Sequence, residues 1–487
     1  MTDCPDAIVV GAGPNGLAAA VTLAAAGLGV RVYEGAPEIG GGCRTSALTS
    51  PGFVHDVCSA VHPMAVASPF FRAFDLTARV DLRVPEVAYA HPLDGGRAGV
   101  VLGSVADTAA RLGPDADAYR RIFRPLVASA TELSELLLAP PLRRLPTDPG
   151  GAAALAAAML RLTGRGVPRT FRTEEARGLF TGAAAHAVQP LRRLATAPFG
   201  LLLTMLAHTT GWPMPRGGSR AITDALAAAL RSLGGEIRVG EPVRDLRELP
   251  RARAVLLDLA PKQFLALAGG RLPAWYAAAV HRFRPGAGVC KVDYALSEPV
   301  PWAAAECRRA GTVHVGGRWA EVDQAMADVV GGRHPQRPFV LAAQPSLVDD
   351  SRAPAGRHVL WAYCTVPPGS DVDVSDRIDA QLERFAPGFR DVVVDRAVRT
   401  AVDYERYNPA YVDGDFTGGA ATVRQLLFRP VPQWDPYRTP LPSVFLCSSS
   451  TSPGAGVHGM CGFQAAKSAL RHRFGVRRAP ELGGVGR

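Results

Sequence analysis

The sequence predicts an α/β fold: a parallel β-sheet that the chain enters at its start and re-enters twice, interrupted by two long inserts. A short apolar run at residues 7–10 leads into a glycine-rich loop and an alanine-rich helical pattern. The segments 215–262 and 443–474 repeat this alternation of short buried strand and helix. The stretches between them, 61–211 and 263–429, carry both helical and strand patterns, so we expect them to form a second, α+β domain.

The unit from residue 7 to residue 34 has the order of a βαβ dinucleotide-binding motif. Its strand is followed by the loop G-A-G-P-N-G at residues 11–16, by a helix that ends near Gly27, and by a second strand at residues 30–33. The free N–H groups and the positive dipole end of the helix would face the phosphates of a dinucleotide. A chance glycine turn is disfavoured because strand, loop, helix, strand and acid follow in this order.

Single residues of the motif match its physical requirements. Gly11 permits the tight turn off the strand, Gly13 lets the backbone approach a pyrophosphate, and Gly16 allows helix and strand to pack closely. Glu34 stands 18 residues after Gly16, where a carboxylate accepts hydrogen bonds from a ribose diol and repels a 2′-phosphate. By itself the motif fits either FAD or NAD.

A second glycine-rich turn, Gly40–Gly42, follows Glu34 and leads into Cys43, Arg44 and Thr45. It resembles the segment after the second strand in the glutathione-reductase-like FAD superfamily. The resemblance implies that the turn approaches the pyrophosphate and that Arg44 adds charge-assisted hydrogen bonds to it. Nicotinamide-dependent dehydrogenases lack this second clamp, so the predicted cofactor is FAD.

The loop Gly454–Gly459 is formally another G-x-G-x-x-G between a strand and a helix. A second nucleotide site for NADPH is the alternative interpretation, but no strand ending in an acid follows the helix, which runs to about Phe474. We expect instead that this helix points its N-terminus at the flavin end of the same FAD. There its dipole would stabilise the negative charge of reduced flavin.

Five motifs carry a family resemblance: residues 11–16, residues 40–45, Pro215–Ser219, Asn408–Pro409 with Gly418–Gly419, and Ser452–Gly459. Over essentially its whole length the chain resembles the phytoene-dehydrogenase-related FAD oxidoreductases, a branch of the flavin amine-oxidase superfamily that holds carotenoid desaturases and isomerases. The resemblance implies a glutathione-reductase-like FAD-binding Rossmann domain with an inserted α+β substrate domain. Many relatives carry an acid after the last strand, where this chain has Ser448–Ser450. Hydroxyl groups can make the same hydrogen bonds.

The predicted FAD-binding domain is discontinuous and comprises residues 1–60, 212–262 and 430–487. The predicted substrate-binding domain comprises the two inserts, 61–211 and 263–429. Within the inserts the clearest patterns are helices at 120–138 and 150–162 and strands at 288–296 and 358–366.

Flavin-dependent desaturation needs a hydride acceptor, which the cofactor supplies, and a group that takes up a proton. The segment Phe53–Pro63 follows the Arg44 clamp, at the point where relatives enter the active site, so His55, Asp56 and His62 are candidate acid–base groups. A local hydrogen-bonded turn explains each of them equally well. His458 is the strongest single candidate because its loop should abut the flavin, although a structural role is an even alternative.

A lysine and two cysteines are further candidates for roles at the flavin. Amine-oxidase relatives often hold a water near the flavin with a lysine, but Lys291 lies in a strand pattern and an exposed strand lysine is the favoured interpretation. Cys43 or Cys58 as a covalent flavin anchor is disfavoured, so FAD is predicted to bind non-covalently. No cysteine pair has C-x-x-C spacing, and no metal site is predicted.

The composition excludes some partners. The formal net charge is +10 and the pI is about 9.5, but the basic residues are scattered and are not interleaved with aromatics, so nucleic acid is not a predicted partner. Reduced thiols and the absence of a signal-peptide pattern predict a cytoplasmic protein. The charge-free stretch Leu194–Pro215 is interrupted by proline and glycine, so it is a poor membrane span. It leaves open a peripheral contact with a membrane; the oligomeric state is not predicted.

The leading functional hypothesis is an FAD-dependent dehydrogenase or desaturase of a hydrophobic small molecule, such as an isoprenoid or a secondary metabolite. A flavin amine oxidase, a redox-neutral flavin isomerase and an escort-type binding protein remain alternatives. In addition to the acid–base candidates, the predicted cofactor-binding residues are Gly11, Gly13, Pro14, Asn15, Gly16, Glu34, Gly41, Gly42, Arg44, Val243, Ser450, Gly456, Val457 and His458.

Overall fold

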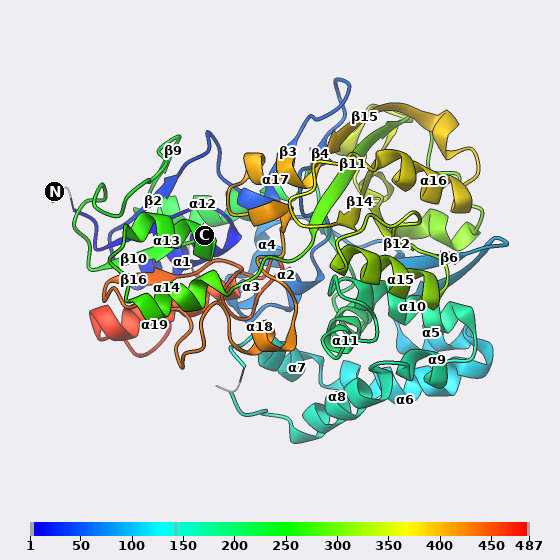
Figure 1. The fold of residues 1–487 in the computed structure, drawn as a ribbon, viewed down its shortest axis with the longest axis horizontal. Coiled ribbons are helices and arrows are strands. Elements are labelled where there is room, and N and C mark those ends of the chain that lie inside the picture. Colours follow the sequence, from blue (N-terminus) through cyan, green and yellow to red (C-terminus); the bar gives the residue numbers. More distant parts are fainter. Residues whose placement is uncertain (1–3, 142–143, 485–487) are drawn as a thin grey trace.

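A five-stranded parallel sheet forms one half of the molecule, on the left in Figure 1. The chain is described here by a computed structural model covering residues 4–141 and 144–484, so the outermost three residues of the first and last predicted segments lie outside it. The two edges of the sheet are β16 and β9, and β1 lies at its centre. In spatial order the strands are β16 (Val444–Leu446), β10 (Ala254–Leu257), β1 (Ala7–Val10), β2 (Val30–Glu34) and β9 (Glu236–Val239).

Helices cover both faces of this sheet because β1 is apolar on both sides. Val9 joins the core formed with α1 (Pro14–Ala25), α12 (Arg220–Ser232) and α19 (Met460–Ala469), whereas Ile8 faces the opposite core. That opposite core contains α13 (Pro261–Ala268) and α14 (Ala274–His281). A strand buried on both faces is expected for a parallel sheet between two helical layers.

A seven-stranded mixed sheet forms the other half, on the right in Figure 1. Only β12 and β6 pair in parallel; the other neighbours are antiparallel. The strands predicted at 288–296 and 358–366 are present with those bounds and pair along their whole length. In spatial order the strands are β15 (Val393–Arg399), β11 (Gly288–Leu296), β14 (His358–Val366), β13 (Val340–Ala343), β12 (Ala310–Val315), β6 (Val87–Leu93) and β7 (Arg97–Val101).

Helices also cover the faces of the second sheet. The pattern at 120–138 forms two helices that meet at Ser129, and the pattern at 150–162 forms one that starts a residue earlier. Within the described residues no helix is long and apolar enough to cross a bilayer. The helices here are α5 (Val105–Ala110), α6 (Ala116–Ala128), α7 (Ala130–Leu137), α8 (Pro149–Leu162), α9 (Gly166–Thr170), α10 (Glu174–Ala185), α11 (Thr196–Ala207), α15 (Trp319–Val330) and α16 (Ser375–Phe385).

Short elements connect the two halves. Phe70 and Phe71, on α3 (Pro69–Ala73), and Phe74, just after this helix, pack into the core of the parallel-sheet half, and α14 packs against that sheet as well. The packing therefore extends this half beyond residues 60 and 262, where the sequence placed its boundaries. The connecting elements are α2 (Pro63–Ala67), α3 (Pro69–Ala73), α4 (Leu76–Arg79), α17 (Ala401–Tyr407), α18 (Val423–Leu427), and the two-residue strands β3 (Thr45–Ser46), β4 (His55–Asp56), β5 (Leu82–Arg83) and β8 (Met214–Pro215).

Candidate active site

One cavity of about 1190 Å³ connects the two halves of the molecule. At one end it is lined by the loop after β1, by the end of β2, and by the turn at Gly41–Arg44. At the other end it reaches the inner face of the seven-stranded sheet at Thr312, Trp361 and Tyr363. Side chains from α7, α8, α11 and α18 close its sides. The cavity therefore joins a glycine-rich end to an apolar end.

The glycine loop is shaped by close backbone packing. Gly11 has a φ of +102°, and a Cβ there would lie 2.9 Å from the carbonyl oxygen of Asp258, the residue that follows the neighbouring strand β10. A Cβ on Gly16 would overlap the carbonyl oxygen of Gly11. Helix α1 starts at Pro14 with no side-chain cap on its N-terminus. Pro14 has no N–H and the N–H of Gly16 donates to Asp258, so the N–H of Asn15 is the one in this first turn that is left for an anion such as a pyrophosphate.

Glu34 stands at the end of β2 as predicted, and both of its carboxylate oxygens are engaged by backbone. One accepts from the N–H of Ala12 at 2.8 Å and the other from the N–H of Ala36 at 2.9 Å. The carboxylate lines the cavity beside the glycine loop. These bonds fix its orientation toward the position where a ribose diol would lie.

Arg44 lies in the cavity wall, held by the turn that precedes it. Its guanidinium donates to the carbonyl oxygens of Ile39 and Glu38, at 3.2 and 2.8 Å, and lies 3.5 Å from a carboxylate oxygen of Glu34. It also lies 5.3 Å from the ring centroid of Tyr407. The side chain is buried, so the position of its charge is set by these contacts.

The structure brings nearly all the predicted cofactor residues to this cavity. Gly16 is set back behind the loop, where its N–H donates to Asp258. The predicted residues that line the cavity are Gly11, Gly13, Pro14, Asn15, Glu34, Gly41, Gly42, Arg44, Val243, Ser450, Gly456, Val457 and His458.

Asp258 is a residue of this site that the sequence reasoning missed. It directly follows β10 and is level with Glu34 in the sheet, because Leu257 and Tyr33, the residues before them, both pair with Val10. Its Oδ2 accepts from the N–H of Gly16 at 2.8 Å. Burial, with a smaller contribution from the charge of Glu34, raises its pKa to about 7. The sequence signal that could have identified Asp258 is its position as an acidic residue directly after a buried apolar strand.

Arg429 was also missed. Its side chain is buried and lines the cavity, donating to the carbonyl oxygens of Gly418 at 2.7 Å and Ser450 at 3.4 Å. In residues 4–141 and 144–484 no carboxylate forms an ion pair with it, and its Nη1 makes no hydrogen bond. Asp415 is near enough to favour the charge, but burial still lowers the pKa of Arg429. A buried guanidinium without an ion-pair partner is costly, and a bound anion would relieve that cost.

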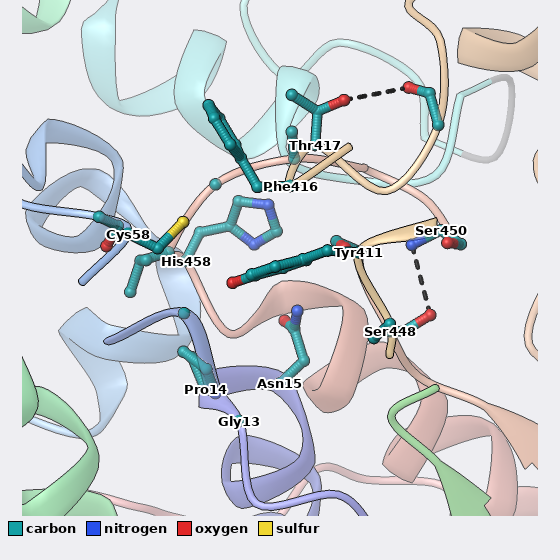
Figure 2. Close-up of a pocket in the computed structure, with 18 of the residues that line it drawn as sticks. Gly13, Pro14, Asn15, Cys58, Tyr411, Phe416, Thr417, Ser448, Ser450 and His458 are labelled. Carbon is teal, nitrogen blue, oxygen red and sulfur yellow. Dashed lines mark hydrogen bonds between the residues drawn. The ribbon is translucent and has the colours of Figure 1, made fainter. Parts of the chain in front are cut away.

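Tyr411 is the third residue that was missed. Figure 2 shows its ring lying across the cavity between Asn15 and His458. Its hydroxyl reaches the Cα of Gly42 so closely that no side chain could stand there. The Oδ1 of Asn15 has no hydrogen-bond partner within the described chain. An unpartnered amide oxygen, an unpaired guanidinium and a glycine-lined helix N-terminus together fit a dinucleotide such as FAD.

His458 lines the cavity, but both nitrogens of its ring are used within its own loop. Nδ1 accepts from the N–H of Met460 at 3.1 Å, so Nε2 carries the hydrogen and donates to the carbonyl oxygen of Gly454 at 3.2 Å. Burial lowers its pKa to about 4. These contacts hold the loop before α19 in place. Of the two roles predicted for His458, catalytic and structural, they favour the structural one.

His55 and Asp56 lie outside the cavity lining, in a buried polar network. Asp56 accepts from Arg352 at 2.8 Å and from the N–H of Ser219 at 2.7 Å. His55 contacts the hydroxyl of Thr49 at 2.8 Å. The network anchors the turn Pro215–Ser219 beneath the cavity, so these two residues have the surroundings of structural groups.

His62 is the one acid–base candidate that both lines the cavity and keeps a ring nitrogen without a partner among the described residues. Its Nε2 lies 2.7 Å from the hydroxyl of Ser219, which itself donates to the carbonyl oxygen of Ser59. The hydroxyl can then only accept from the imidazole, so Nε2 carries the hydrogen and Nδ1 keeps its lone pair. Burial lowers the pKa of His62 to about 4, which keeps the ring neutral.

The interpretation of Lys291 as an exposed strand lysine is wrong. The side chain is buried, forms an ion pair with Asp293, and lies 5.5 Å from the ring centroid of Trp361. Burial lowers its pKa and the carboxylate opposes that shift. β11 places Lys291 and Asp293 on the same face, because side chains two residues apart on a strand point the same way.

The thiols near the cavity are held in the protonated form. Burial raises the pKa of Cys58 to about 11 and also raises that of Cys43. Cys58 lines the cavity, as Figure 2 shows, whereas Cys43 lies behind the turn. A protonated thiol is a poor nucleophile.

The far wall of the cavity is one row of the second sheet. Thr312 on β12 is opposite Ala343 on β13, which is opposite Trp361 on β14. The hydroxyl of Thr312 and the indole N–H of Trp361 have no hydrogen-bond partner within the described residues. The rest of this end is aliphatic or aromatic, including Phe199, Leu203 and Leu341.

This fold and cavity define an FAD-dependent oxidoreductase. The model of the family "Flavin containing amine oxidoreductase" matches residues 15–467, and the chain belongs to that family. It is 26% identical to the rat pyridine nucleotide-disulfide oxidoreductase domain-containing protein 2, over 96% of this chain and 93% of the rat protein.

A second relative and a solved structure are also similar to the chain. The chain is 27% identical to the phytoene dehydrogenase of Streptomyces griseus, over 92% of each protein. The solved structure of a redesigned putrescine oxidase superimposes with a TM-score of 0.61 over 96% of this chain and 98% of the oxidase, at 17% identity. The family brings a flavin cofactor; the likeness to the oxidase concerns the fold alone.

Proposed function

We propose that this chain is an FAD-dependent dehydrogenase that desaturates a hydrophobic small molecule and holds its FAD without a covalent bond. The observation that carries the proposal is the continuity of the cavity, which leads from the glycine cradle directly to an apolar chamber. Bound FAD supplies the hydride acceptor. The phytoene-dehydrogenase-related resemblance supports an isoprenoid or a similarly apolar substrate.

The residues of the chain bind the cofactor, orient the substrate and take up a proton. The glycine loop, Glu34 and Arg44 bind the dinucleotide, and the apolar wall orients the substrate and excludes water. We assign to His62, which lines the cavity, the uptake of the proton released from the carbon next to the hydride donor; its unprotonated nitrogen, Nδ1, is buried just behind the cavity wall, so the ring must turn for this nitrogen to reach the substrate. Non-covalent binding is supported by the raised pKa of Cys58, which keeps that thiol protonated.

Anaerobic mixing of the flavin-loaded protein with a lipophilic isoprenoid tests the proposal. We expect the substrate to bleach the flavin absorbance. Turnover without bleaching would instead indicate a redox-neutral isomerase, and bleaching by short aliphatic amines alone would indicate an amine oxidase. A purified chain that shows no flavin absorbance and takes up no added FAD would contradict the proposal and favour an escort-type binding protein.

The role of His62 is tested separately by H62Q. We expect the rate of flavin reduction to fall roughly a hundredfold, the low end for loss of a positioned base, while FAD affinity stays unchanged. In the unaltered protein this rate should hold constant down to the imidazole pKa of about 4 and be lost below it, because the protonated ring cannot accept a proton. An H62Q variant with the original rate would exclude this residue as the base.

A further inference from the structure

Four large aliphatic side chains line the cavity and are also exposed at the surface. They are Leu160 (82% exposed), Leu194 (63%), Val423 (47%) and Leu427 (38%). A side chain that does both lies where the cavity opens. These four residues, which we call the mouth rim, therefore surround the entrance to the apolar end.

The mouth rim is built from three separate parts of the chain. Leu160 is on α8, Leu194 precedes α11, and Val423 and Leu427 are on α18. Figure 1 shows α8 and α18 in the lower half of the molecule. Phe428 is exposed beside them, and the outward positions of α8 that precede Leu160 are alanines. Apolar side chains gathered around one opening mark an interaction surface rather than scattered exposure.

Within the segments that carry the mouth rim, the charged residues all have one sign. The three segments that carry it, residues 149–172, 186–212 and 416–434, contain no aspartate or glutamate. Arg161, Arg165 and Arg424 are exposed in these segments. None of these three guanidiniums forms an ion pair with a described residue. An apolar opening bordered by unpaired cations matches an anionic lipid surface, where aliphatic groups enter the acyl boundary and arginines contact phosphates.

We propose that the mouth rim docks on the surface of an anionic lipid bilayer, so that a lipophilic substrate passes from the bilayer into the cavity without crossing water. The proposal of docking depends only on the exposed residues of the mouth rim, whereas the proposal that substrate passes from the bilayer rests on the proposed function. The attachment is peripheral and uses side chains that frame the opening. A snorkelling arginine such as Arg161 can keep its charge at the headgroups while Leu160 beside it is immersed.

Co-sedimentation of the flavin-loaded protein with vesicles tests the docking. We expect binding to vesicles of phosphatidylcholine mixed with phosphatidylglycerol, weaker binding to phosphatidylcholine alone, and loss of the difference at high salt. L160Q/L194Q should weaken binding to both kinds of vesicle roughly tenfold because it removes the immersed groups. R161E/R424E should abolish the preference for the anionic vesicles.

Matched variants elsewhere control for general effects of surface polarity and charge. W275Q removes a larger exposed apolar side chain, 61% exposed on α14 and outside the cavity lining. R357E/R390E makes the same change in net charge at two exposed arginines outside the mouth rim. Both controls should bind vesicles as the unaltered protein does.

Three results would overturn the docking proposal. One is failure of the unaltered protein to bind anionic vesicles; another is equal loss of binding in the control variants. The third is a dimer, seen by light scattering, that L160Q/L194Q splits, because a second copy would then cover the mouth rim. Bleaching of the flavin by detergent-dispersed substrate tests the proposed function independently, so failure of one proposal is distinguishable from failure of the other.

Discussion

Asp258 places a titratable carboxyl beside the glycine loop, near the position of the pyrophosphate. Its pKa is raised to about 7, against an ordinary value of 3.8. Between these two values the folded chain keeps a proton that the unfolded chain has released. The stabilising contribution of this proton is therefore complete at low pH and is lost as pH rises to about 7. Above that value a negative charge would lie beside the phosphates of a bound FAD.

FAD affinity should accordingly fall as pH rises through neutrality. We expect the dissociation constant, measured by quenching of flavin fluorescence, to rise roughly tenfold from about pH 6 to about pH 8, a change of about 1.4 kcal/mol. D258N keeps an oxygen that can accept from Gly16 but carries no charge, so its affinity should not change over this range. A D258N variant with the original pH dependence would assign the effect to another group.

Arg429 is the opposite case, a buried cation that forms no ion pair with a described residue, although Asp415 lies near enough to favour its charge. We expect R429Q to raise the dissociation constant for FAD by roughly tenfold, because a charge-assisted hydrogen bond to a phosphate is lost. The dissociation constant of R429K should lie between those of the unaltered protein and R429Q, because lysine keeps the charge but not the planar, forked guanidinium group. If R429Q lowers the melting temperature and leaves FAD affinity unchanged, the arginine only holds the carbonyl groups of Gly418 and Ser450.

These residues show which parts of the site were accessible to sequence reasoning. Gly11, Gly16 and Glu34 were predicted because their roles depend on a local backbone geometry that one contiguous motif specifies. Asp258 and Arg429 come from segments hundreds of residues away, and only the pairing of β10 with β1 and the packing of the loop at Ser450 bring them to the cavity. Lys291 was misjudged because periodicity does not reveal that both faces of β11 are covered.

At the scale of elements, the seven-stranded sheet sets the depth of the apolar chamber. Neighbouring strands are about 4.8 Å apart, so Thr312 and Trp361 are separated by roughly 10 Å with the small side chain of Ala343 between them. The long apolar runs of β11 and β14 predicted these strands with their correct bounds. Their order in the sheet, which places Ala343 between the two lining residues Thr312 and Trp361, depends on long-range pairing and could not be predicted from the apolar runs.

A343L should narrow the substrate end without affecting the cofactor end. We expect it to weaken binding of an apolar, environment-sensitive fluorophore roughly tenfold, since the added carbons occupy the space of the ligand. Its FAD affinity should be unchanged. A342L serves as the control, because Ala342 faces the opposite core of the same strand; it should lower stability but leave fluorophore binding by the folded protein intact. Equal effects of the two variants would show that the loss arises from general destabilisation.

At the scale of the molecule, the cavity wall is assembled from both sheets and from the segments that cross between them. The turn at Gly41–Arg44 belongs to one half, whereas Tyr407 and Tyr411 arrive from the segment that follows β15 in the other. A dinucleotide bound here would contact both halves at once. Its binding energy should therefore appear in the stability of the whole fold and not of one half alone.

We expect FAD to stabilise the chain as one cooperative unit. At a free concentration of about 100 times the dissociation constant, the free energy of unfolding should rise by about 2.7 kcal/mol, the value that mass action gives for a ligand bound only by the folded state. Urea unfolding followed by circular dichroism and by flavin fluorescence should then give coincident transitions that shift together. G13L, which places a side chain against Asp258 and closes the phosphate site, should show no shift. Two separate transitions, of which only one responds to FAD, would mean that the halves unfold independently and that the crossing segments contribute little to binding.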